Sequence, residues 1–156
     1  MSDRGVIKYV ARAQQINDFS GMLLGKITPT DIDAVIEYQD KAYIFIEIKY
    51  KDKDLPYGQR LALERLANDT IKAGKKSIVL VAEHEVENTH QSVDTAQCRI
   101  RKYYFNNQWH IPKETITVID AVYKFLNINK LPDDIYQEPT VSSEEILTDD
   151  VALVNN

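Results

Sequence analysis

The feature that most constrains the fold is a short, wholly apolar run, Ile78-Val79-Leu80-Val81, within Ser77–Ala82. A strand with one face in water alternates apolar and polar residues, whereas a continuous apolar run is typical of a strand buried on both faces. Such a strand lies inside a sheet that helices cover on either side. We therefore expect an α/β protein with a central sheet between helices.

The residues before this run predict a hairpin followed by a helix. Ala34–Tyr38 and Lys41–Tyr50 are rich in β-branched and aromatic residues, as strands are. Asp54 can cap a helix, with a proline in its first turn, that runs to about Ala73 and stops at Gly74. This order of elements is compatible with strands on either side of a crossover helix.

The remaining elements complete a single mixed sheet flanked by helices. Arg99–Phe105 alternates and predicts a strand, and Asn106–Asn107 predicts its turn. Thr117 with Asp120 three residues later forms a capping box that opens a final helix. Loose helical spacing in Ile7–Leu24 predicts a first helix. The expected order is helix, hairpin, helix, strand, strand, helix.

The charge of the chain is divided unevenly along its length. The 156 residues carry a formal net charge of -5, but all 19 Lys and Arg lie at or before Lys130. Seven of the 24 acidic residues follow Pro132, so the rest of the chain contains 17 acidic and 19 basic residues. We expect a single domain over 1–132 and an acidic, disordered tail over 133–156. The overall acidic charge therefore does not exclude a nucleic-acid partner for the domain.

Other features exclude several classes of protein. Cys98 is the only cysteine, which rules out an internal disulfide and a thiolate metal site. No stretch reaches the roughly 18 apolar residues of a membrane span, and the first residues do not read as a signal peptide. We expect a cytoplasmic protein that has no membrane partner.

An acid and a base lie together at the end of an otherwise apolar predicted strand. Side chains alternate along a strand, so Glu47 and Lys49 share one face with Phe45. Burying such charges costs several kcal/mol each unless they are paired or bind a metal. The simplest interpretation is a salt bridge where the strand emerges into solvent.

A second carboxylate favours a metal site instead. If the hairpin turn has three residues, 39–41, then Asp33 lies opposite Glu47, with Cβ atoms about 4.5–5.5 Å apart. Two carboxylates at that distance repel each other, but they suit a hard divalent cation, which prefers oxygen ligands. With a loop one residue longer or shorter, Asp31 competes for this position.

One polar residue interrupts the apolar stripe of the predicted helix. Helical spacing places Leu55, Gln59, Ala62 and Leu66 on one side of the helix. Gln59 is its polar member, so we expect it to face the sheet near the charged end. The alternative is that Gln59 satisfies an exposed backbone group.

Together these residues resemble a known family. Asp33, followed after 13 residues by Glu47-Ile48-Lys49, resembles the signature of the PD-(D/E)xK nucleases, which include restriction endonucleases and Holliday junction resolvases. Asp31 in Pro29–Asp31 is similar to the Asp of the Pro-Asp pair, and Gln59 matches a glutamine found in several branches. The resemblance covers about residues 28–82.

The chain departs from the family at one point. Many members carry a glutamate on the first helix, whereas here Gln14, Gln15 or Asp18 occupies that region. The completeness of a metal site is therefore in question. The resemblance leaves open a catalytically inactive module that binds DNA or a protein partner on the same fold. An interaction protein whose acidic tail is the active part is a third reading.

The resemblance implies a restriction-endonuclease-like fold and a metal-dependent DNA endonuclease that hydrolyses phosphodiester bonds. In that reading Asp33, Glu47 and the carbonyl of Ile48 hold Mg²⁺, for which Mn²⁺ can substitute. Lys49 orients the attacking water and offsets the charge that develops in the transition state. Gln59 positions the water or the phosphate.

The resemblance also implies a partner and a setting. DNA is the expected partner, and the basic residues that follow the motif are candidates for contacts with its phosphates: Lys51, Lys53 and Arg60. Their alternative is a solvated loop and helix face. The small size favours a structure-selective enzyme or a homodimer, of phage or mobile-element origin, in a bacterial or phage-infected host cell.

Overall fold

The computed structural model describes residues 8–128, which fall into two compact units. One unit, 18–130, holds the sheet, and the described part of the other, 8–17, holds a single helical turn, α1 (Val10–Ala13). The first helix predicted within Ile7–Leu24 is confirmed only in part, because the helical structure over the described residues 8–24 is limited to α1 and the 3₁₀ turn η1 (Ser20–Met22). Neither turn buries a residue, and short helices need tertiary packing to persist.

Five strands form one mixed sheet in sequence order. They are β1 (Ala34–Tyr38), β2 (Ala42–Tyr50), β3 (Lys76–His84), β4 (Arg99–Phe105) and β5 (Gln108–His110). The β2–β3 pair is parallel and the other pairs are antiparallel. The prediction of an α/β fold with a mixed sheet is confirmed, whereas β5 was missed because three residues carry too little pattern.

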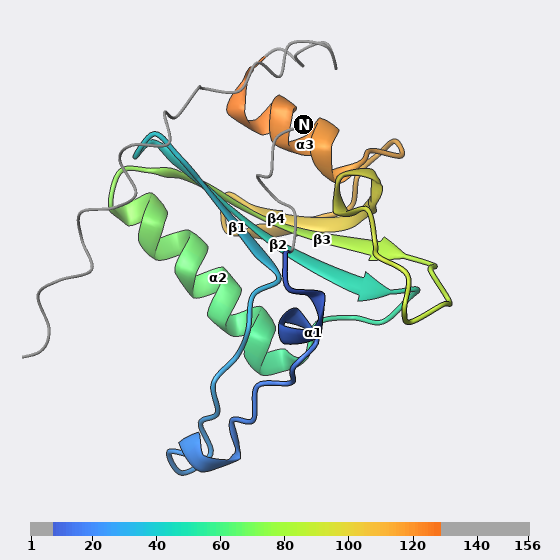
Figure 1. The fold of residues 1–156 in the computed structure, drawn as a ribbon. Helices are drawn as coiled ribbons and strands as arrows, with labels where there is room; N and C mark the ends of the chain where they lie inside the picture. Colours follow the sequence, from blue (N-terminus) through green and yellow to red (C-terminus); the bar gives the residue numbers. More distant parts are fainter. Residues whose placement is uncertain (1–7, 129–156) are drawn as a thin grey trace, which may run out of the picture. The chain divides into compact units, whose positions relative to one another are not determined.

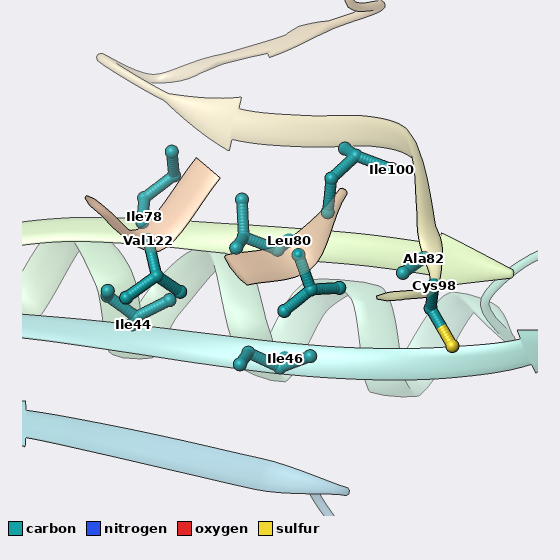
Figure 2. Packing of buried hydrophobic residues seen from close by; sticks show 9 residues of the cluster. Ile44, Ile46, Ile78, Leu80, Ala82, Cys98, Ile100 and Val122 are labelled. Atoms are coloured by element: carbon teal, nitrogen blue, oxygen red, sulfur yellow. The ribbon is translucent and has the colours of Figure 1, made fainter. Parts of the chain in front are cut away.

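Two helices cover opposite faces of the sheet (Figure 1). Helix α2 (Tyr57–Lys72) links β2 to β3, and α3 (Val118–Leu126) follows β5. Alternate residues of β2 and β3 divide between the faces: Ile44 packs with Val122 of α3, as in Figure 2, and Phe45 packs with Leu63 of α2. Strand β3 is buried from its second to its eighth residue, as its apolar run predicts.

The β1–β2 hairpin has the predicted three-residue turn. Tyr38 pairs with Ala42 and Ala34 pairs with Ile46, which places the turn at 39–41. Gln39 and Asp40 adopt left-handed backbone angles, φ 51° and 55°. This register brings Asp33, the residue before β1, to the position opposite Glu47.

The two ends of α2 compare differently with their predictions. Asp54 does not cap the helix, because α2 begins at Tyr57 and the Asp54 carboxylate accepts from the Leu55 amide (2.7 Å) and pairs with Lys102 (2.5 Å). The predicted stop is confirmed, since Gly74 follows the C-cap with φ +84°. The capping box of α3 is also confirmed, because the Thr117 side chain accepts from the Asp120 amide.

The buried stripe of α2 is narrower than its sequence spacing predicts. Gln59, Leu63 and Ala67 are buried, one helical turn apart, whereas Leu66 is 40% exposed. Gln59 thus faces the sheet as predicted, but the prediction that Leu66 does so is wrong. The apolar pattern permitted either row, and the packing against Val79 and Val81 selected the row of Leu63.

The predicted acidic tail and the predicted absence of a membrane span concern residues that the structure describes only in part. The tail over 133–156, and with it the domain boundary at 132, lies outside the described residues. No helix within residues 8–128 has the length and apolarity needed to cross a bilayer.

The two leucines of α2 provide a test of this packing. We expect Leu63→Ala to lower the free energy of unfolding by about 2–5 kcal/mol, because it leaves a cavity between α2 and the sheet. Leu66→Ala, the matched control, should cost under about 1 kcal/mol. Urea denaturation of both variants measures the difference, and equal costs would contradict the observed orientation of the helix.

Candidate functional site

Glu47 is a charged residue with no exposed surface at the centre of the sheet. Its Oε2 atom accepts hydrogen bonds from Lys49 Nζ at 3.0 Å and from Gln59 Nε2 at 2.8 Å. Its Oε1 atom is buried and has no hydrogen-bond partner within the part of the chain that the structure describes. Because buried polar atoms are nearly always paired, this unpartnered oxygen is a candidate ligand atom.

Lys49 and Gln59 close a polar cluster around this carboxylate. Lys49 Nζ donates to Gln59 Oε1 at 3.0 Å as well as to Glu47. Gln59 Nε2 also donates to the backbone carbonyl of Asp31 at 3.1 Å. Both ends of the Gln59 amide are therefore engaged, and the residue ties α2 to β2 and to the segment before β1.

Asp33, rather than Asp31, provides the second carboxylate. Its Oδ2 atom accepts from the backbone amide of Ile48 at 2.7 Å. Opposed residues of an antiparallel pair share a face, so the register places Asp33 on the face of Glu47. The observed register, with the turn at 39–41, is the one expected to place Asp33 there, and the backbone carbonyl of Asp31 accepts from Gln59.

The main chain of Ile48 faces the same edge. The Ile48 amide points toward Asp33, and in an antiparallel pair the carbonyl of a residue points to the same side as its amide. The Ile48 side chain packs on the opposite face, against the cluster under α3. The site therefore combines the carboxylates of Glu47 and Asp33 with the main chain of Ile48.

The environment of Glu47 changes its acidity. Burial raises the pKa of the Glu47 carboxyl above its ordinary value of 4.5. The hydrogen bond from Lys49 opposes this shift, and the negative charge of Asp33 adds to it. Glu47 consequently releases its proton less readily than a glutamate in water.

A third acid, which the sequence did not single out, lies next to the cluster. Glu83 of β3 is the register partner of Lys49 and is only 9% exposed. Both of its oxygens are engaged, one by Arg99 and the other by Arg101 at 3.2 Å. The sequence signal for this acid is the alternation of Arg99 and Arg101 along a predicted strand. That signal points to Glu83 only once this strand, β4, is known to lie beside β3.

The three basic residues predicted to contact DNA differ in their surroundings. Lys51 pairs with Glu87 at 3.2 Å, and Arg60 lies 3.6 Å from Glu64. Lys53 is exposed, and among the described residues no ion pair engages its side chain. Its backbone carbonyl accepts from Arg101 at 2.7 Å, which anchors this loop to the sheet.

Asp33 and Glu47 are two carboxylates, fewer than the three protein side chains sought for a metal site. Within residues 8–128, no group of three or more His, Cys, Asp or Glu side chains is arranged to hold a metal ion. Gln14 and Gln15, two of the three residues considered in place of a first-helix glutamate, follow the single turn of α1.

The raised pKa of Glu47 predicts how stability depends on pH. The folded protein binds this proton more tightly than the unfolded chain does. The contribution of Glu47 to the free energy of unfolding therefore decreases as the pH rises from 4.5 through the raised pKa. Glu47→Gln cannot ionise. We expect its free energy of unfolding, relative to the wild type, to increase across that pH range in urea titrations. The exposed Glu114→Gln is the control for the substitution itself, and a constant difference for Glu47→Gln would contradict the raised pKa.

The chain was compared with known proteins at three levels. No family model, no curated protein and no solved structure matches it. The geometry of the residues described above is therefore the basis for any functional assignment.

Proposed function

We propose that the protein is a metal-dependent DNA endonuclease that resembles the PD-(D/E)xK nucleases. One observation carries the proposal: a fully buried glutamate, Glu47, keeps one carboxylate oxygen without a hydrogen-bond partner among the described residues. Glu83, by comparison, has both of its oxygens engaged. An oxygen left without a donor suits a cation.

The residues present fit a hard divalent cation. Asp33, Glu47 and the carbonyl of Ile48 would hold Mg²⁺ or Mn²⁺, because all three supply oxygen. When bound, the ion polarises the scissile phosphate and lowers the pKa of a water molecule. The hydrogen bond of Asp33 to the Ile48 amide holds that carboxylate at the end of the hairpin.

Lys49 is the group suited to the transition state. The Lys49 side chain is 20% exposed, and its ammonium donates hydrogen bonds to Glu47 and Gln59, which hold it in place. A held cation stabilises the charge that grows on the phosphate oxygens and orients the attacking water. Gln59 has both ends of its amide engaged, so it also positions Lys49 and Glu47, in addition to the water or the phosphate that the resemblance assigns to it.

DNA is the proposed partner, with the loop after β2 as its contact. Lys51 and Lys53 lie in this loop, and Arg60 lies on the first turn of α2 that follows. Phosphate contacts of this kind position the duplex without reading its sequence. A structure-selective enzyme in a bacterial or phage-infected cell, acting alone or as a homodimer, is consistent with so small a domain.

A second candidate follows from the small number of acids. With two carboxylates at the site, the protein can instead be a catalytically inactive module that holds DNA or a protein partner. Activity on DNA in Mg²⁺ or Mn²⁺, with EDTA as the control, separates the two candidates. Cleavage that EDTA abolishes supports the enzyme, and binding without cleavage in either metal supports the module.

Lys49→Ala provides the sharpest test of the mechanism. We expect cleavage to fall about 100-fold or more, because a group that acts in the transition state affects turnover. Affinity for DNA, measured in EDTA by fluorescence anisotropy, should change little. Lys113→Ala, an exposed lysine far from the cluster along the chain, is the matched control and should cleave normally.

The acids are tested by metal binding instead. Asp33→Asn and Glu47→Gln should each remove Mn²⁺ binding measured by calorimetry, and cleavage with it, while DNA affinity in EDTA is retained. Undiminished cleavage by either variant, or by Lys49→Ala, would reject the mechanism.

The surroundings of the basic residues predict a ranking in DNA affinity. Lys53→Ala should weaken binding and reduce the salt dependence of the association constant by about one unit of logarithmic slope, because Lys53 is a lysine without an acid partner. Lys51→Ala should have the smaller effect, since Glu87 already offsets its charge. Titrations at several salt concentrations measure both slopes, and a larger effect at Lys51 would contradict the ranking.

A further inference from the structure

An exposed apolar arm leads into the candidate site. The arm, residues 18–30, precedes β1 and extends away from the sheet in Figure 1, within the same compact unit. Its large apolar side chains are mostly in solvent: Phe19 38%, Met22 58%, Leu23 58%, Leu24 73% and Ile27 69% exposed. A soluble domain rarely leaves so many large apolar groups together without a partner for them.

The arm is a preformed turn. The backbone amide of Leu24 donates to the carbonyl of Ile27 at 3.0 Å, and the reverse bond is 3.1 Å. Gly25 between them has φ +66°, an angle that glycine adopts readily. Met22 donates to the carbonyl of Phe19 at 2.9 Å in η1. The side chains are therefore presented on a shaped backbone, so that little ordering is needed on binding.

The segment that follows the arm is hydrogen-bonded to the cluster of Glu47, Lys49 and Gln59. Gln59, which holds Glu47 and Lys49, also binds the backbone carbonyl of Asp31. Ile27 precedes Asp31 by four positions, which limits the distance between their Cα atoms to about 14 Å. One strand of duplex DNA rises about 3.4 Å per nucleotide, so this distance corresponds to about four nucleotides.

We propose that the arm is a wedge that inserts apolar side chains between bases next to the cleaved phosphate. This inference rests on the proposed nuclease function. The backbone of DNA is charged, and the faces of its bases are the one apolar surface that these side chains can cover. Proteins that kink DNA insert Leu, Ile, Met or Phe in this way. Lys26, exposed on the turn between Leu24 and Ile27, supplies a cation for a neighbouring phosphate.

The wedge defines a class of substrate. Inserting a side chain requires unstacking of a base step, and that step opens most easily where stacking is already interrupted. Branch points, nicks and junctions between single and double strands meet this condition, whereas intact duplex does not. The arm thus selects DNA with an open base step within a few nucleotides of the scissile phosphate.

The test uses the full chain and a three-way DNA junction that carries 2-aminopurine at its branch. This base becomes more fluorescent when it unstacks, and EDTA keeps the DNA intact. We expect the wild type to increase the fluorescence on binding. Leu24→Ser/Ile27→Ser should abolish the increase and reduce the preference for junction over intact duplex about tenfold. Ile111→Ser, which alters an 81% exposed apolar residue elsewhere, is the matched control and should behave as the wild type.

The outcomes separate the wedge from the nuclease. Unchanged fluorescence and preference in Leu24→Ser/Ile27→Ser overturn the wedge, and the nuclease assignment still stands if Lys49→Ala abolishes cleavage. Arm-dependent fluorescence without cleavage in Mg²⁺ or Mn²⁺ retains the wedge and rejects the enzyme. Light scattering gives a further check, because a wild-type dimer that this double variant converts to a monomer assigns the arm to a protein interface and overturns the proposal.

Discussion

The burial of the Glu47 carboxylate is the constraint on which the site depends. A carboxylate without exposed surface is costly unless donors surround it, and here Lys49 and Gln59 both donate to one of its oxygens. That requirement fixes the rotation of α2 on the sheet, since Gln59 must point inward. It also fixes the segment before β1, through the carbonyl of Asp31. The other oxygen, like Arg60 Nε and Ser77 Oγ, is a buried polar atom that has no hydrogen-bond partner among the described residues.

The elements that could be predicted from the sequence are those with a strong local signal. The apolar run of β3, the glycine stop of α2 and the capping box of α3 all correspond to the structure. The length of the first helix and the Asp54 cap were predicted wrongly for a shared reason. Their local patterns are weak and tertiary contacts decide the outcome: neither α1 nor η1 buries a residue, and the Asp54 carboxylate pairs with Lys102.

The candidate site shows the same division. The approach of Asp33 to Glu47 follows from strand alternation and the length of one turn, both of which can be read from residue spacing. The engagement of Asp31 and the presence of Glu83 beside Lys49 could not be read in this way. Both depend on which strand lies next to which, and the parallel pairing of β2 with β3 is set by packing over a crossover of many residues.

The turn at residues 39–41 has a consequence at the far end of the hairpin. Side chains in a strand alternate with a period of two, so adding or removing one residue in the turn moves every side chain of β1 to the other face of the sheet. Asp33 would then point toward α3, away from Glu47, although the turn itself touches neither residue. The left-handed backbone of Gln39 and Asp40 therefore fixes the register that keeps Asp33 and Glu47 on one face of the sheet. Natural variation in the length of this turn should occur in steps of two residues.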